Sequence, residues 1–168
     1  MKTLLAVLMS VCTIVVLSSC DGGLEPYPIP PDFTGFRGTV YFAGDSAAWP
    51  TDSIYNLVVV AFEEKPDSVG DILPAVLGGR AVFSKSMPLF VDSATYEIEL
   101  PADRERTFRY VVVGMQDGPA ITQDWTMLSI HAVDNDPLRP DSVTIVPGKT
   151  TIIDFNVDFS NLPPQPFD

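Results

Sequence analysis

The stretch "ATYEIELPA", residues 94–102, indicates which fold to expect from this chain. Apolar and polar side chains alternate along it. The apolar positions are Tyr96, Ile98 and Leu100, and the polar positions are Thr95, Glu97 and Glu99. Because successive side chains of a β-strand point to opposite faces, this alternation predicts a strand with one buried and one solvent-exposed face.

The same period of two recurs near both ends of the domain. In "GFRGTVYFAG", residues 35–44, the shared face carries Phe36, Val40 and Phe42, with Gly38 between them. In "TTIIDFNVDF", residues 150–159, it carries Ile153, Phe155, Val157 and Phe159. The stretches "NLVVVAFEE" (56–64) and "FRYVVVGMQ" (108–116) are instead apolar on both faces, which is typical of central strands.

Shorter segments complete the set: "WTMLSIHAV" (125–133), "DSVTIVPG" (141–148) and "RAVFSKS" (80–86). Sixteen prolines and several Gly-Asp, Asp-Gly and Pro-Gly pairs separate them, and no stretch carries a convincing amphipathic helix. We therefore predict an all-β fold, a seven- to eight-stranded antiparallel Greek-key β-sandwich over residues 36–160.

One connection does not fit the strand pattern. The segment "PDSVGDILPAVLGG", residues 66–79, is apolar and has no clear period. We expect Ile72, Leu73, Val76 and Leu77 to cap an open end of the sandwich. The alternative is an exposed apolar patch for a partner.

The N-terminus has the layout of a secretory signal. Lys2 supplies a positive charge, and Leu4 to Leu17 form an apolar run too short for a comfortable membrane span. Leu17-Ser18-Ser19-Cys20 resembles the bacterial lipobox, in which a cysteine after two small residues is lipidated and becomes the mature N-terminus. This resemblance implies a signal peptide over residues 1–19 and a lipid anchor on Cys20. The alternative is an ordinary signal, with Cys20 not modified.

Two or three acyl chains anchor a protein stably, so the domain is expected to be tethered to a bacterial membrane. Residues 20–35 hold Pro26, Pro28, Pro30 and Pro31 and predict an extended spacer, in which about a dozen residues reach ~35–40 Å. Residues 161–168 form a proline-rich tail. We favour the outer membrane, with the domain in the periplasm or at the cell surface.

Charge and cysteine content narrow the possible functions. The net charge of −12 repels phosphate backbones, which argues against nucleic-acid binding. Of the two cysteines, Cys12 leaves with the signal and Cys20 is consumed by the lipid. The mature domain then has no free thiol, which excludes cysteine nucleophiles, iron–sulfur clusters and cysteine-based zinc sites.

The order of the strand motifs resembles a known family. The motifs are "FRGTVYF" (36–42), "AWP" (48–50), "NLVVVAF" (56–62), "ATYEIELPA" (94–102), "YVVVG" (110–114) and "VPGKTTIIDFNVDF" (146–159). Together they are similar to the carboxypeptidase-regulatory-like, or prealbumin-like (transthyretin-type), β-sandwich modules of secreted and lipid-anchored bacterial proteins. An immunoglobulin-like sandwich is the alternative.

The resemblance implies a fold rather than a reaction. The enzymatic relatives, the hydroxyisourate hydrolases, use several histidines, an arginine and a C-terminal Tyr-Arg-Gly-Ser. This chain has one histidine and ends in "PPQPFD". That single histidine, His131, lies near Asp134, and no nucleophile motif accompanies it. We therefore expect no catalytic activity and no cofactor.

Two binding sites remain candidates. The loop "DNDPLRPD" gathers Asp134, Asn135, Asp136 and Asp141, whose oxygen atoms suit Ca²⁺, although the EF-hand spacing is absent. Trp49 and Trp125 are candidates for stacking against a sugar ring, or else they pack over the core. The sequence thus favours a non-catalytic, lipid-anchored interaction or accessory module whose partner is an envelope protein or glycan. A sugar- or calcium-binding module is the alternative.

Overall fold

The computed structural model describes residues 33–44, 49–50, 54–120 and 123–167, all of them within one compact unit, Asp32–Asp168. The strands are β1 (Gly35–Phe42), β2 (Asn56–Phe62), β3 (Ala81–Phe83), β4 (Ser93–Glu99), β5 (Arg106–Phe108), β6 (Tyr110–Gln116), β7 (Trp125–Ile130), β8 (Val143–Ile145), β9 (Thr150–Ile152) and β10 (Phe155–Val157). The helical elements are η2 (Val69–Asp71), α2 (Ile72–Leu77) and η3 (Val133–Asn135).

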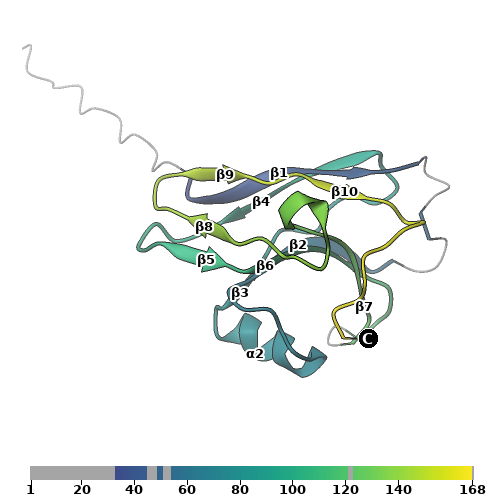
Figure 1. The fold of residues 1–168 in the computed structure, drawn as a ribbon, viewed down its shortest axis with the longest axis horizontal. Coiled ribbons are helices and arrows are strands. Elements are labelled where there is room, and N and C mark those ends of the chain that lie inside the picture. Colours follow the sequence, from purple (N-terminus) through teal and green to yellow (C-terminus); the bar gives the residue numbers. More distant parts are fainter. Residues whose placement is uncertain (1–32, 45–48, 51–53, 121–122, 168) are drawn as a thin grey trace, which may run out of the picture. The chain divides into compact units, whose positions relative to one another are not determined.

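The strands form two main sheets that face each other, as the all-β sandwich prediction required (Figure 1). Sheet A has the order β10-β1-β4, with β9 also paired to β1, and sheet B has the order β3-β2-β6-β7. A two-stranded ladder of β5 and β8 completes the described strands. Most pairings are antiparallel, but β1 pairs in parallel with β9 and β10. Alternation of side chains is common to both directions, so the sequence does not reveal this difference.

The main core fills the space between the two sheets. The alternation in residues 94–100 is confirmed, because Tyr96, Ile98 and Leu100 are buried while the residues between them are exposed. Opposite them, Leu57 and Val59 of β2 and the odd-numbered residues of β6 turn inward. The inward rows of the two sheets therefore seal each other from water.

Gly38 interrupts the inward apolar row of β1 because another backbone segment approaches too closely for a side chain. A Cβ at Gly38 would lie 1.8 Å from the carbonyl oxygen of Ile153. That oxygen accepts a 2.8 Å hydrogen bond from the hydroxyl of Tyr96, the partner of Gly38 in the β1–β4 pairing. The carboxylate of Asp154 accepts a 2.7 Å bond from the N–H of Thr39. Asp154 lies between β9 and β10, so its side chain provides the acceptor for β1 at the place where neither strand does.

Strands β2 and β6 lie at the centre of sheet B and are buried on both faces, as their sequences predicted. A second, smaller core covers the outer face of the sheet. It consists of Phe62, Ala81, Tyr110, Val112 and Met127.

Helix α2 lies on this second core, on the side of sheet B away from sheet A (Figure 1). Ile72 and Val76 pack against the core, whereas Leu73 and Leu77 are 48% and 79% exposed. The 66–79 connection thus covers a sheet face rather than an end of the sandwich. The sequence did not predict this helix, because six residues are too few to establish a helical period.

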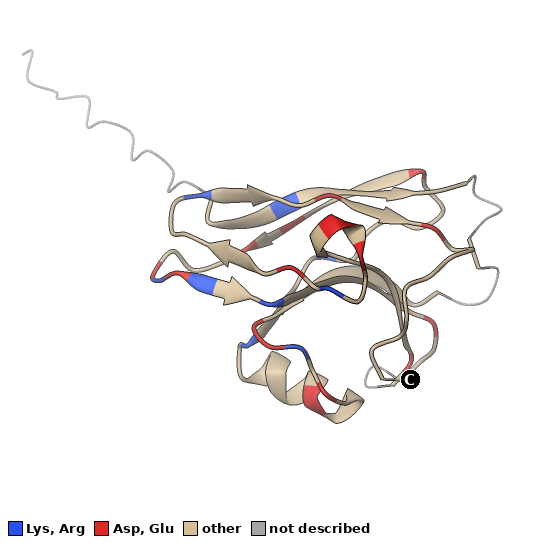
Figure 2. Cartoon of the chain, in the orientation of Figure 1, with Lys and Arg blue, Asp and Glu red and all other residues tan. Residues whose placement is uncertain are grey.

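Charged residues gather in the loops and at sheet edges (Figure 2). Helix α2, of sequence ILPAVL, carries no charge, so the acidic character of the chain does not extend to its surface. Among the described residues, no helix combines the length and the apolar character needed to cross a bilayer.

Candidate functional site: an apolar groove on the outer face of sheet B

Trp49 is a core residue in the structure. Its side chain is 4% exposed, and its ring centroid lies 4.6 Å from that of Phe42, 4.8 Å from Phe159 and 5.5 Å from Phe90. Neither face of the ring is open to a sugar. The candidate pair is therefore not a joint platform, because Trp125 lies on the outer face of sheet B instead.

Trp125 begins strand β7, and its ring lies over Gly114 of β6. A Cβ on Gly114 would be 3.3 Å from Cε3 of that ring, so the glycine leaves room for the indole. The Trp125 side chain is partly exposed and lines a groove together with residues of β2 and β6. Of the two tryptophans, Trp125 alone borders an accessible hollow.

The calcium candidates do not converge on a point. Asp134 forms a 3.6 Å ion pair with Arg139, and Asp136 accepts a 3.0 Å bond from the N–H of Leu138. Asp141 accepts a 2.8 Å bond from the N–H of Ser142. Within the described ranges, no three histidine, cysteine, aspartate or glutamate residues are grouped to hold a metal ion. The acids of this loop instead stabilise its turns.

Asn135 belongs to the same loop and lies, like Asp134, in left-handed backbone, with φ values of 58° and 56°. Asn and Asp tolerate this conformation better than most residues, which accounts for both in the tight η3 turn. The side chain of Asn135 is exposed.

His131 lies at the end of β7 and is 3.9 Å from Asp141, from its Nε2 to the carboxylate Oδ2. An acid–base pair of this kind needs a nucleophile within hydrogen-bond reach. None of the hydrogen bonds in the described part of the chain joins a serine or threonine hydroxyl to His131. Cys20, the signal region and most of the spacer fall outside the described residues.

The groove is lined almost entirely by apolar side chains of the described residues and has a volume of about 320 Å³. Its floor is the outer face of sheet B, with Val58, Val60, Phe62, Tyr110, Val112 and Met127. One wall is α2, through Ile72, Leu73 and Val76, and the other is the C-terminal tail, through Pro166 and Phe167. Two sequence-based candidates contribute to this groove: Trp125, and the 66–79 segment, whose alternative interpretation was an exposed apolar patch for a partner. The floor was not predicted as a site, although the apolar outer faces of β2 and β6 indicated that they need a cover.

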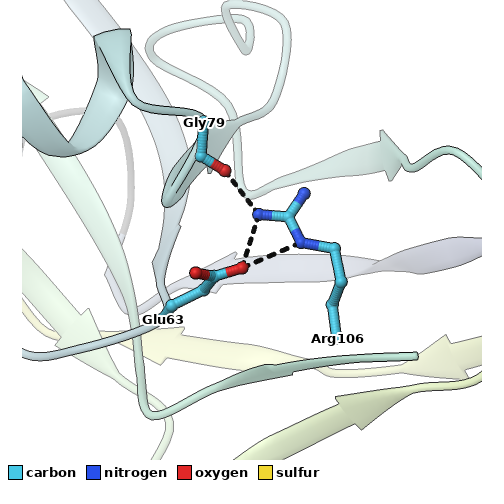
Figure 3. A network of polar contacts seen from close by, with 3 residues as sticks. All are labelled: Glu63, Gly79 and Arg106. Carbon is cyan, nitrogen blue, oxygen red and sulfur yellow. Dashed lines mark hydrogen bonds and ion pairs between the residues drawn. The ribbon is translucent and has the colours of Figure 1, made fainter. Parts of the chain in front are cut away.

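Local sequence and one arginine position the helical wall. Ser68 and Asp71 form a capping box, with the carboxylate of Asp71 accepting bonds from the Ser68 N–H (2.9 Å) and hydroxyl (2.8 Å). Beyond the helix, Arg106 of β5 donates a 2.5 Å bond to the carbonyl of Gly79 and pairs with Glu63 at 2.9 Å (Figure 3). A cation suits the C-terminal end of a helix, so Arg106 ties α2 to the end of β2.

The tail wall is attached to the edge of sheet B by one side-chain amide. The Gln165 carbonyl oxygen accepts a 2.8 Å bond from the N–H of Met127, and its NH₂ group donates a 3.1 Å bond to the Met127 carbonyl. The amide therefore satisfies the backbone of edge strand β7 as a neighbouring strand would. The predicted proline-rich tail forms part of the groove.

Polar groups are few in the groove and lie at two places. Asn56 and Gln116 lie at one end, on the same rung as Trp125, and Thr126 is the next residue of β7. Toward the other end, the hydroxyl of Tyr110 donates to the sulfur of Met127 at 3.2 Å. Burial raises the pKa of Tyr110, so this hydroxyl keeps its proton.

A second hollow, of about 650 Å³, lies beside edge strand β4. Its lining mixes the cations Arg37 and Lys85 with the anions Glu97 and Asp154, all of them exposed. Solvated charges of both signs do not define a ligand, so the apolar groove is the better candidate site.

The protein is an all-β sandwich that has an apolar groove on the outer face of one sheet. Comparison of the chain with protein-family models, with curated proteins and with solved structures found no match in any of the three.

Proposed function

We propose that this protein is a non-catalytic bacterial lipoprotein whose sandwich acts as an interaction module at the cell envelope. In this proposal residues 1–19 are a signal peptide, Cys20 carries the lipid, and residues 20–35 hold the domain away from the membrane. The outer membrane is the favoured location. The lipobox-like Leu17-Ser18-Ser19-Cys20 supports the anchor.

The observation that carries the interaction role is the groove on sheet B. Folded domains rarely leave contiguous apolar surface open unless it binds something. Here Leu73 and Phe83, both lining residues, are 48% and 57% exposed, and Leu77 extends the apolar surface along α2. We infer that an apolar partner covers this surface.

The side chains that catalysis would need give no support to an enzymatic role. His131 has a distant carboxylate, and the acids of the 134–141 loop are engaged in turns. The groove holds no carboxylate, histidine or cysteine among its lining residues. We retain the prealbumin-like, carboxypeptidase-regulatory-like relationship as part of the proposal, because the two-sheet arrangement agrees with it and the motif order favours it.

Carbohydrate binding is the second candidate. It is favoured by the partly exposed ring of Trp125, which lies beside the amides of Asn56 and Gln116 at one end of the groove. A Trp125→Ala variant that loses binding to a glycan array at unchanged stability would promote this candidate over the first.

The anchor is tested by metabolic labelling with an alkyne-bearing fatty acid. We expect the full chain to be labelled and membrane-bound, and Cys20→Ser to lose both properties. Cys12→Ser is the matched control, because Cys12 is removed with the signal and its replacement should change neither. Persistent labelling of the Cys20→Ser chain would refute the anchor.

A further inference from the structure

The groove has the dimensions of a site for a hydrocarbon chain. Its volume of about 320 Å³ is at the lower end of the range of small-molecule sites, about 300–1,000 Å³, and its lining is almost entirely apolar. The exposed side chains of Leu73 and Phe83 continue the apolar surface beyond this volume. A longer chain would therefore remain in contact with apolar atoms at the rim.

The floor of the groove does not suit an extended peptide. Strand β2 pairs with β3 and β6, and β6 pairs with β7, so the backbone groups of the floor are engaged within the sheet. A peptide lying on this floor would bury its own N–H and C=O groups without hydrogen-bond partners, which is unfavourable for each group. A hydrocarbon chain has no such groups.

One place in the groove does offer polar recognition. Tyr110 is 3% exposed, and its hydroxyl donates only to a thioether, which is a weak acceptor. The ammonium of Lys65 lies 5.9 Å from the centre of the same ring, next to the lining residue Pro66. No carboxylate of the described residues forms an ion pair with Lys65. A carboxylate is the group that would accept a hydrogen bond from Tyr110 and pair with Lys65.

We propose that the groove binds an unesterified long-chain fatty acid. Its chain lies between α2 and the C-terminal tail, and its carboxylate lies beside Tyr110 and Lys65. The inference rests on the proposed function, because it names the apolar partner of the same surface. The net charge of −12 repels anions in general, so the local cation Lys65 is what makes this place beside the groove favourable for a carboxylate.

The test uses the full chain in total lysates of expressing cells, which contain both membrane-bound and released protein. A palmitic acid analogue with a photoreactive diazirine and a terminal alkyne is added, the sample is irradiated, and the labelled peptides are identified by mass spectrometry. We expect saturable labelling in β2, β6 and α2 that palmitate suppresses. Methyl palmitate, which keeps the chain and loses the charge, should compete at least fivefold less well.

Conservative variants separate recognition from folding. Tyr110→Phe should weaken binding about fivefold through loss of one buried hydrogen bond. Lys65→Met should weaken it about threefold, as an exposed ion pair does. Lys85→Met is the matched control, since Lys85 lines the other hollow and its replacement should have no effect.

Labelling that is not saturable, that lies outside the groove, or that is insensitive to both Tyr110→Phe and Lys65→Met would overturn the inference. Labelling that occurs only in the Cys20→Ser chain would also overturn it, because the groove would then hold the protein's own acyl group. These outcomes are distinct from failure of the lipoprotein proposal, in which groove labelling persists while Cys20 carries no lipid.

Discussion

The two faces of sheet B are built from the same strands and are covered in different ways. The inner face of β2 and β6 is sealed by the side chains of sheet A. The outer face is just as apolar, yet its cover is a six-residue helix on one side and a tail held by one glutamine on the other. Two faces of one strand can therefore both be apolar and buried without being equally well packed. The inner face provides stability, and the incompletely covered outer face provides a site.

The largest effect on stability is expected at Gly38, which belongs to the inward row of β1 on the sealed side. Replacement by valine places a Cβ 1.8 Å from the Ile153 carbonyl and must displace the β9–β10 edge. We expect Gly38→Val to lower the free energy of unfolding by about 3 kcal/mol or more, measured by denaturant titration. Gly70→Ala is the control, because its Cβ would meet only the Ser68 hydroxyl at 3.5 Å. Equal stability of the two variants would contradict this account of the β1 row.

Neighbouring valines of β6 compare the two faces directly. Val113 points into the main core, and Val112 points into the outer core beside the groove. Val113→Ala leaves a cavity with no room to collapse, at an expected cost of about 2 kcal/mol, against about 1 kcal/mol for Val112→Ala. The measurement is again the free energy of unfolding. A larger cost for Val112→Ala would mean that the outer face is the better packed one.

The cover of the outer face is tested at Arg106. Arg106→Met removes the bonds to Glu63 and Gly79 and should cost about 2 kcal/mol, because this side chain is largely buried. Hydrogen exchange in residues 72–79 should accelerate as α2 loosens. Arg109→Met breaks the exposed pair with Glu64 and should cost under about 1 kcal/mol. If α2 exchanges at the same rate in both variants, Arg106 does not hold the helix.

The smallest effect concerns the pH dependence of the sealed face. Burial, and then the charge of Asp154, raise the pKa of Tyr96 well above its ordinary value of 10.0. The folded state thus favours the protonated hydroxyl, and the stability this contributes is complete below pH 10 and is lost as the pH rises above it. At pH 7 Tyr96→Phe should cost about 1 kcal/mol through the lost bond to Ile153.

Above pH 10 the wild-type chain should lose stability relative to Tyr96→Phe, by about 1.4 kcal/mol at pH 11. Urea titrations of both chains at pH 7 and pH 11 measure the difference. A constant difference between the two pH values would show that Tyr96 does not titrate with unfolding.

The strands were predictable because their pattern is local. The alternation at residues 94–100 and the doubly apolar runs in β2 and β6 appear with the expected burial. The candidate site was not predictable in the same way. Trp49 is a core residue because Phe42, Phe90 and Phe159 surround it, and these come from positions far apart in the chain.

The sequence by itself determined that this chain is an all-β sandwich, because the direction of each side chain along a strand follows from a period of two. It also determined that β2 and β6 require cover on both faces. Tertiary structure alone decided what supplies that cover. The six residues of α2, too few to show a helical period, pack on one side of the sheet. On the other side, Gln165 bonds to Met127 across a sequence separation of 38 residues. Such contacts depend on which segments the fold brings together, and no local pattern records that.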